Sequence, residues 1–374
     1  MSSDRGLGPE GRPSEWHRDT EQAISLTGDS SSVTRPDLPA AEAEQLAPKS
    51  ADWTPFAALQ RPPQEAGVGQ SAQEPAGAVE VASPSPGTGA MFARPPEYRR
   101  PHPMGGKARR LPRLSHAVPD ITLDGADFDG LTVRAASLRG DDHRYMTEPR
   151  QDTATLWPVT FGGAEALLCG VADGLGSQPN SHMGSQLACW LLRNEFERGA
   201  DAGLWEDPVA FGRDIVGRIA SGMLTDAEAR RIHPETLSTT LVAACVELAV
   251  PDRPRRAMVL RVGDSTAYML RDGVFHDCFE DAHKGEDVQE SGTSALPGNP
   301  GSAEAGTVTL GNDDVLVLCT DGLSNPMHND EVRAQLAEWW GSGRVPGILE
   351  FGWQLGFRAK SYGDDRSVVC VWGR

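Results

Sequence analysis

Residues Ala166–Ala188, ALLCGVADGLGSQPNSHMGSQLA, place an acidic dipeptide between an apolar run and a helical pattern. The apolar run, Leu167–Ala172, has the length and composition of a buried strand. It ends at Asp173 and Gly174, and a carboxylate at the end of a buried strand is costly unless its charge is compensated. A cation is one such partner, and a glycine lets a cation approach the main-chain carbonyl. Asp-Gly is also a common turn dipeptide, so a simple turn is the alternative interpretation of this pair taken alone.

The same arrangement recurs at four other places in the chain. These aspartates also stand at the edges of short apolar runs that resemble strands, and we expect their carboxylates to converge at one end of a pair of sheets. Oxygen ligands without a nearby Cys/His cluster favour Mg²⁺ or Mn²⁺ over Zn²⁺. The four are Asp152 before Thr153–Phe161, Asp264 after Met258–Val262, Asp321 after Val315–Cys319, and Asp364 before Ser367–Trp372.

Composition excludes several classes of function. The 374 residues allow one or two domains, and the net charge of −18 argues against binding nucleic acid through a general basic field. The six cysteines are widely spaced and form no CxxC pair, which predicts buried thiols in a reducing compartment. No apolar stretch approaches the ~18 residues of a membrane helix. The N-terminus shows no apolar core of a secretory signal, so we expect a cytoplasmic protein without membrane contact.

The first part of the chain differs in composition from the rest. Residues 1–118 are rich in Pro, Gly, Ala, Ser, Glu and Gln, and such a segment buries too little apolar surface to offset its ordering entropy. We expect residues 1–118 to be disordered and residues 119–374 to form one folded domain. Two patches in the first segment, Asp52–Leu59 and Arg94–Arg113, are candidate docking motifs for a partner, and a solvated linker is the alternative.

From about Pro119 the chain reads as a sequence of strands with helices grouped separately. This order predicts an α+β fold with two antiparallel β-sheets packed as a central sandwich flanked by helices. We expect Arg139–Asp152 to be a polar loop and Phe279–Ala305 a long surface loop. The predicted strands are Leu131–Leu138, Ala154–Phe161, Ala166–Ala172, Ser238–Leu248, Ala257–Val262, Ala267–Leu270, Thr307–Leu310, Val315–Cys319 and Ser367–Trp372, and the predicted helices are Met183–Glu197, Asp207–Leu224, Asn329–Trp340 and Pro346–Arg358.

Six motifs in order resemble the metal-dependent type 2C protein serine/threonine phosphatases in their bacterial form. The resemblance covers about residues 130–372 and implies the same α-β-β-α sandwich with a two-metal centre at one edge. Each motif alone is weak, and the order and spacing of all six make the resemblance specific. The motifs are RQD (Arg150–Asp152), GVADGLGS (Gly170–Ser177), STTLVAA (Ser238–Ala244), RVGDSTAYMLRDG (Arg261–Gly273), LCTDGLSN (Leu318–Asn325) and DDRSVV (Asp364–Val369).

The resemblance assigns a metal role to each of the aspartates. It implies that Asp173 bridges two Mn²⁺ or Mg²⁺ ions, with the Gly174 carbonyl on the second ion. Asp321 and Asp364 complete the shell of the first ion, and Asp152 lies near the second. Asp264 matches a position that helps to hold a third, weaker ion.

The expected reaction is hydrolysis of phosphoserine and phosphothreonine in proteins by a hydroxide that bridges the two metals. Two cations neutralise the phosphoryl oxygens of a phosphomonoester and activate a shared water near neutral pH. The chain shows no G-x-S-x-G elbow and no cysteine signature for covalent catalysis. The expected partners are phosphorylated proteins, the substrates of a serine/threonine kinase. The alternatives are a catalytically weak pseudophosphatase that binds phosphoproteins, or a scaffold in which the N-terminal segment is the functional part.

Two features depart from the family pattern. Many members carry an arginine five residues before the first metal aspartate, where it holds the substrate phosphate, and this chain has Thr147 there. Arg144 and Arg150 lie nearby and are the candidates to replace it. His182 lies in a segment similar to one that places a histidine near the metals as a general acid. Its alternative role is that of a surface histidine at the start of a helix.

Overall fold

The computed structural model describes residues 94–101, 107, 110–114, 116–161, 163–198, 203–248, 253–279 and 294–374. Two sheets dominate these residues, and every pair of neighbouring strands within them is antiparallel. One sheet has five strands in the order β10-β7-β6-β5-β4. Its strands are β4 (Thr153–Phe161), β5 (Ala164–Ala172), β6 (Leu241–Glu247), β7 (Arg255–Val262) and β10 (Glu304–Leu310).

The second sheet has six strands in the order β2-β3-β13-β11-β8-β9. It packs face to face on the first sheet around a shared apolar core. Its strands are β2 (Ile121–Phe128), β3 (Leu131–Leu138), β8 (Thr266–Arg271), β9 (Val274–Asp277), β11 (Val315–Cys319) and β13 (Arg366–Gly373).

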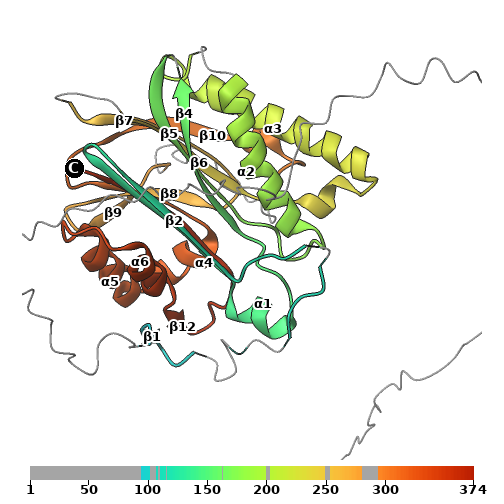
Figure 1. Cartoon of the computed structure of the whole chain (residues 1–374), viewed down its shortest axis with the longest axis horizontal. Coiled ribbons are helices and arrows are strands. Elements are labelled where there is room, and N and C mark those ends of the chain that lie inside the picture. The colour runs from blue at the N-terminus through green and yellow to red at the C-terminus, as the bar shows by residue number, and fades with distance from the viewer. Residues whose placement is uncertain are drawn as a thin grey trace, which may run out of the picture. The chain divides into compact units, whose positions relative to one another are not determined.

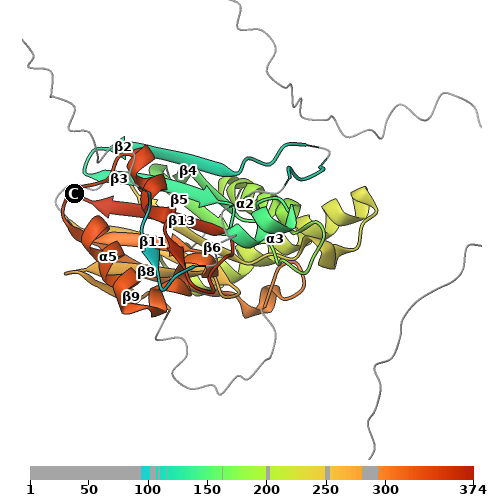
Figure 2. The ribbon, with the colours of Figure 1, turned by 90° about the horizontal axis from the view of Figure 1, so that it is seen from below.

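Helices cover the outer face of each sheet, as Figures 1 and 2 show. Helices α2 (Ser181–Arg198) and α3 (Pro208–Arg230) pack on the five-stranded sheet, and α5 (Asp330–Gly341) and α6 (Ile348–Leu355) pack on the other. The predicted α+β fold, a sandwich of two antiparallel sheets flanked by helices, is confirmed. No helix of the described residues is long and apolar enough to cross a membrane.

Strand β5 shows why the core strands read as continuous apolar runs. Leu167, Cys169 and Val171 face the other sheet, whereas Leu168 and Ala172 face the helices, and all five are buried. A strand covered on both faces has no polar side to alternate with. Burying each leucine stabilises the fold by roughly 1.5–3 kcal/mol. All six cysteines are free thiols, and five of them are buried, as predicted.

Several elements were not predicted, among them strand β2 and two short helices. Strand β2 lies at a sheet edge, and its half-exposed sequence ITLDGADF contains residues that are unfavourable in strands. The segment Arg139–Asp152, predicted to be a loop, contains the six-residue helix α1 (Asp141–Met146), whose first turn carries two aspartates that favour a helix start. The short helix α4 (Asp321–Ser324) begins at a predicted metal aspartate.

Residues 94–101 differ from the prediction made for the first segment. They contain strand β1 (Glu97–Tyr98), which pairs in parallel with β12 (Arg358–Ala359). Tyr98 packs edge-on against Phe357 with the ring centroids 5.7 Å apart. The predicted helix Pro346–Arg358 therefore ends earlier, at Leu355, and gives way to β12. Most of residues 1–118, including the motif Asp52–Leu59, and most of the predicted loop Phe279–Ala305 lie outside the described residues.

Candidate metal centre

The ends of strands from both sheets bring the five predicted aspartates to one edge of the sandwich. Antiparallel pairing sets Thr153 opposite Ala172, so Asp152 and Asp173 flank one strand pair. In the other sheet Cys319 pairs with Val368, which brings the end of β11 beside the start of β13. The carboxylates of the site are close enough to interact electrostatically. These aspartates are Asp152, Asp173, Asp264, Asp321 and Asp364.

Asp173 lies at the centre of this group. Its carboxyl lies close enough to that of Asp321 for the two to influence each other's pKa, although the two residues belong to different sheets. Its main chain is fixed by the STTLVAA motif, because the Thr240 amide and the Thr239 hydroxyl each donate to the Asp173 carbonyl at 2.8 Å. Burial raises the pKa of the Asp173 carboxyl well above its ordinary value, and the carboxylates of Asp152, Asp321 and Asp364 raise it further. Such crowding of like charges is a feature of functional sites.

Two buried carboxylate oxygens of this group lack a hydrogen-bond partner. Asp152 is 2% exposed, and the Thr320 hydroxyl donates to its Oδ2 at 2.9 Å, but its Oδ1 accepts no hydrogen bond. Asp321 Oδ1 is in the same condition. Burial raises the pKa of Asp152 well above its ordinary value, with the Asp365 and Asp364 carboxylates adding to the effect. Unpaired carboxylate oxygens among like charges fit a divalent cation that prefers oxygen ligands.

The glycines of the two Asp-Gly motifs are required by close packing. Neither Gly174 nor Gly322 has a positive φ angle, so a left-handed turn does not explain them. A Cβ atom on Gly174 would lie 2.6 Å from the Ser181 carbonyl oxygen. A Cβ atom on Gly322 would lie 1.8 Å from the Asp365 carbonyl oxygen. These contacts favour the ligand interpretation of the motifs over the simple turn, since backbone segments converge at both aspartates.

The guanidinium groups of Arg144 and Arg150 are bound to other protein groups. Arg150 is 5% exposed and donates to the Ser137 hydroxyl and, at 3.1 Å, to the Pro119 carbonyl. Arg144 donates to the Asp120 carboxylate at 2.8 and 3.3 Å. Arg150 also interacts electrostatically with Asp152, and the role of both arginines in holding phosphate stays a prediction.

His182 lies in the first turn of α2 and is 5% exposed. The centroid of its ring lies 6.0 Å from the centroid of the His116 ring. Burial lowers the pKa of the His182 imidazole, and the neighbouring His116 lowers it further. The start of α2 is tied to the site by the Ser181 hydroxyl, which donates to Gln151 Oε1 at 2.7 Å. The structure thus gives His182 the surroundings of a helix-start residue, and its role as a general acid stays a prediction.

Sequence reasoning gave no role to two residues at this edge, Asp365 and His143. The Asp365 side chain is 1% exposed, and its Oδ1 accepts from the Gly140 amide at 2.7 Å and from His143 Nδ1 at 2.8 Å. Its Oδ2 accepts from the amides of Gln151 and Asp152. Burial opposes protonation of His143, but the surrounding carboxylates prevail and raise its pKa to about 9. The only signal in the sequence was the position of Asp365 directly after Asp364.

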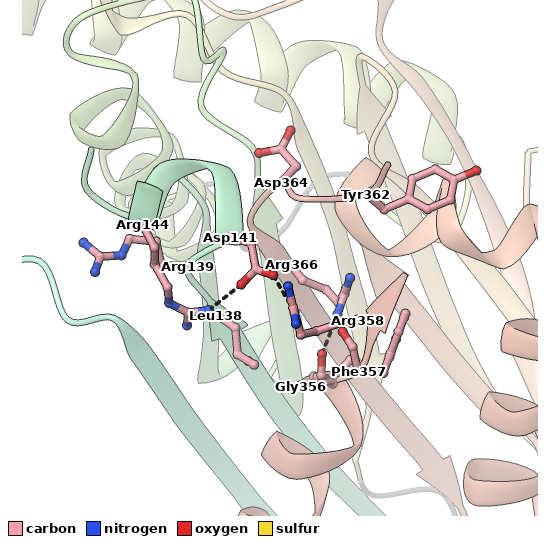
Figure 3. A pocket seen from close by; sticks show the side chains of 12 residues that line it. Leu138, Arg139, Asp141, Arg144, Gly356, Phe357, Arg358, Tyr362, Asp364 and Arg366 are labelled. Carbon is pink, nitrogen blue, oxygen red and sulfur yellow. Dashed lines mark hydrogen bonds and ion pairs between the residues drawn. The ribbon is translucent and has the colours of Figure 1, made fainter. Parts of the chain in front are cut away.

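A cavity of about 140 Å³ opens beside Asp364, between α1 and the segment that follows α6 (Figure 3). Asp141 and Arg358 lie next to each other in it, joined by an ion pair of 2.7 Å. Arg366 is buried at its base, donates to the Leu355 and Phe357 carbonyls, and lies over the Phe357 ring. The arginines that line this cavity are paired with carboxylates or carbonyls. Among these pairs, the ion pair between Asp141 and Arg358 holds α1 against the segment that follows α6.

The family model for protein phosphatase 2C matches residues 139–349, which include Asp152, Asp173, Asp264 and Asp321, and Asp364 follows the matched range. The chain belongs to the protein phosphatase 2C family, and it is a protein serine/threonine phosphatase by that membership. Phosphorylated proteins are the corresponding class of substrate. A comparison with curated protein sequences finds no significant match.

Solved structures of bacterial phosphatases are similar to the chain at low sequence identity. The serine/threonine phosphatase PstP/Ppp of Mycobacterium tuberculosis shares 20% identity at a TM-score of 0.44, and the match covers 65% of this chain and 99% of that one. The PstP catalytic domain in complex with two manganese ions shares 19% identity at a TM-score of 0.43, covering 67% and 98%. The S. agalactiae serine/threonine phosphatase shares 17% identity at a TM-score of 0.44, covering 68% and 100%.

Proposed function

We propose that this phosphatase hydrolyses phosphoserine and phosphothreonine in proteins with two divalent cations, Mn²⁺ or Mg²⁺, at the aspartate edge. The observation that carries the proposal is the pair of buried, unpartnered carboxylate oxygens on Asp152 and Asp321. Burying a carboxylate without a compensating partner is costly. A fold that concentrates several such groups at one edge gains stability when cations bind there.

The proposed ligand set is the one that the family resemblance implies, and the proximity of the carboxylates supports it. Asp173, which contacts Asp321 and interacts with Asp152 and Asp364, is suited to bridge two ions. Asp321 and Asp364 would then hold one ion together with it, and Asp152 and the Gly174 carbonyl would hold the other. The Asp264 carboxylate helps to raise the pKa of Asp321, and Asp264 is suited to hold a third, weaker ion. Carboxylate and carbonyl oxygens are the ligands that Mg²⁺ and Mn²⁺ prefer.

Bound cations of this kind neutralise phosphoryl oxygens and increase the acidity of water. The protein's own part is to hold the carboxylates in place and to provide no competing nucleophile. Burial raises the pKa of all six cysteine thiols, which removes the thiolate that a cysteine-dependent phosphatase needs. Direct attack by water agrees with this and with the absence of a G-x-S-x-G or cysteine nucleophile motif in the sequence.

The test is hydrolysis of a chromogenic phosphomonoester and of a phosphothreonine peptide by the full chain, with Mn²⁺, with Mg²⁺ and in excess chelator. We expect turnover with either metal and none in chelator. Asp272→Asn is the matched control for changes at the aspartate edge, because Asp272 lies in the turn between β8 and β9 at a positive φ that asparagine tolerates. Turnover in excess chelator would refute the metal centre. Metal and phosphopeptide binding without turnover would establish the pseudophosphatase instead.

A further inference from the structure

We propose that a cavity at the end of the sandwich opposite the metal edge binds a small oxyanion, a phosphate or a carboxylate, through Arg255. The cavity measures about 590 Å³. It contains none of the five aspartates of the metal edge, so the proposal does not depend on the proposed function. The residues of its lining on which the site depends are Asp129, Gly130, Arg253, Arg255, Asn312 and Arg374.

The cavity lies where strand ends of both sheets meet. Arg255 is the first residue of β7 in the five-stranded sheet. In the other sheet the Arg374 amide, directly after β13, donates to the Gly130 carbonyl, directly before β3, at 3.0 Å. Because β7 runs from Arg255 to Val262, roughly 23 Å of strand separates this end from the segment that carries Asp264. In Figure 1 the C-terminus marks this end, away from α1.

Arg255 is a buried cation whose charge the protein does not neutralise. It is 8% exposed, and an arginine side chain stays protonated. Its Nη2 donates to the Asp129 main-chain carbonyl at 2.9 Å, but its Nε is buried without a hydrogen-bond partner. Within the part of the chain that the structure describes, no carboxylate forms an ion pair with it. A buried charge without a counter-charge is costly, which indicates that an anion completes the site.

The turn before β3 holds the guanidinium group of Arg255 in place. Gly130 has a φ of +68°, and a Cβ atom on it would lie 2.8 Å from Arg255 Nη2. Glycine is therefore required both for the left-handed conformation and for the close approach of the guanidinium to the main chain. A donor group that is already fixed in position loses little freedom when a ligand binds.

The other side chains of the cavity make its lining cationic. Arg253 and Arg374 bring two further guanidinium groups, and Asn312 brings a side-chain amide. Asp129 is the one acidic side chain among the described residues of the lining. Arg253 also binds Glu247, which offsets part of its charge. Among the lining side chains, positive charge therefore exceeds negative charge.

The size of the cavity and the type of its donors define the class of ligand. A volume of about 590 Å³ lies within the range of small-molecule sites. The planar fork of an arginine matches the paired oxygens of a carboxylate or a phosphate. The cavity is thus suited to a small molecule that carries one of these groups. Inorganic phosphate, pyrophosphate and citrate are the probes that separate the two chemistries.

The experiment measures binding of each probe to the full chain by calorimetric titration, after dialysis against a buffer free of divalent cations. The variants are Arg255→Met, which removes the charge, and Arg255→Lys, which keeps the charge without the fork. Arg213→Ala is the control, because Arg213 is an exposed arginine of α3. We expect wild type to bind at least one probe at a single site. Arg255→Met should weaken this binding by about 10- to 100-fold, Arg255→Lys by less, and Arg213→Ala by less than about twofold.

Urea unfolding distinguishes a ligand site from an arginine that only supports the fold. Without an anion, we expect Arg255→Met to unfold at the same urea concentration as wild type or at a higher one, because the unpaired charge is gone. The bound probe should raise the unfolding midpoint of wild type and leave that of Arg255→Met unchanged. A markedly lower midpoint of Arg255→Met without an anion would overturn the proposal.

The pattern of probes that bind decides the chemistry of the ligand. Binding of phosphate or pyrophosphate without citrate supports a phosphorylated ligand, and the reverse supports a carboxylate. Binding of none of the three, or equal affinity in wild type and Arg255→Met, overturns the proposal. Should Arg255→Met not fold, Asp129→Asn is expected to strengthen binding and Arg374→Ala to weaken it, each by roughly threefold. Unchanged affinity in both of these variants would overturn the proposal as well.

Discussion

The Thr320 hydroxyl donates a hydrogen bond of 2.9 Å to Oδ2 of Asp152, and this contact ties the two sheets together at the metal edge. Thr320 follows β11 of the six-stranded sheet, whereas Asp152 precedes β4 of the five-stranded sheet. The same hydroxyl accepts from the Ser367 amide at 3.1 Å. One side chain thus connects three of the strand ends from which the centre is built.

Thr320→Val tests the importance of this contact, because valine keeps the shape of the side chain and removes the hydroxyl. Asp152 would lose its donor and the Ser367 amide its acceptor. We expect the metal-free protein to lose about 1–3 kcal/mol of stability, the usual penalty for leaving buried polar groups unsatisfied. Denaturant unfolding with and without Mn²⁺ measures it, and the loss should be smaller with the metal. An equal loss in both conditions would place the effect outside the centre.

The aspartates themselves are expected to differ in importance. Asp173→Asn removes the carboxylate that contacts or interacts with three others, and we expect kcat/KM to fall by ~10³-fold or more. Asp321→Asn and Asp364→Asn should be nearly as severe, and Asp264→Asn milder. The measurement is kcat/KM of each variant at saturating Mn²⁺, compared with wild type and with the Asp272→Asn control. Wild-type kcat/KM in Asp173→Asn with unchanged metal dependence would refute the assignment of this edge.

Gly322→Ala probes the close packing behind the second Asp-Gly motif. A methyl group there would meet the Asp365 carbonyl oxygen at 1.8 Å, so the backbone has to shift at Asp321 and Asp365 together. We expect a loss of roughly 3 kcal/mol or more in stability, with a matching loss of metal affinity. Gly217→Ala, in α3, is the control: its Cβ meets nothing within 4 Å, and alanine should stabilise the helix by up to ~1 kcal/mol. Equal melting temperatures for the two variants would contradict the packing argument.

The fold was predictable because its central strands are buried on both faces. Val315–Cys319 and Leu167–Ala172 show this as unbroken apolar runs. The aspartates are visible in the sequence because a charged residue stands out at the end of such a run. Helix α1 was not predictable, since its six residues, DDHRYM, carry no apolar periodicity and the helix is held by contacts with residues 363–365. The part played by Asp365 was hidden likewise, because its donors lie more than 200 residues away in the chain.

Strand β1 shows that the folded domain begins earlier than residue 119. The Arg358 amide donates to the Pro96 carbonyl at 2.9 Å, and the Lys360 amide to the Tyr98 carbonyl at 3.1 Å. Tyr98→Ala should destabilise the domain by about 1–3 kcal/mol through loss of its contact with Phe357, and Tyr98→Phe should change little. Arg100→Ala, at an exposed position, is the control. Unfolding measurements that place Tyr98→Ala at the stability of wild type would show that β1 is not part of the folded unit.

Glu247 gives a prediction for pH dependence at a place remote from the centre. Its carboxylate accepts hydrogen bonds from Arg253 at 2.9 and 3.1 Å and from Arg256 at 2.7 to 3.0 Å. Burial opposes ionisation, but these bonds prevail and lower the pKa from its ordinary value of 4.5 to about 2. A carboxyl with a lower pKa in the folded state stabilises the fold above pH 4.5, and this contribution is lost as the pH falls toward 2.

Glu247→Gln should therefore be less stable than wild type at pH 7, and the difference should shrink between about pH 4.5 and 2. We expect about 1 kcal/mol at neutral pH and not the several kcal/mol that the full shift implies, since Arg253 and Arg256 are 47% and 45% exposed and solvent screens the pairs. Urea unfolding of both proteins across this pH range gives the difference, and 1 M NaCl should reduce it at pH 7. A difference that stays constant from pH 7 to pH 3 would show that the glutamate acts through packing and not through its charge.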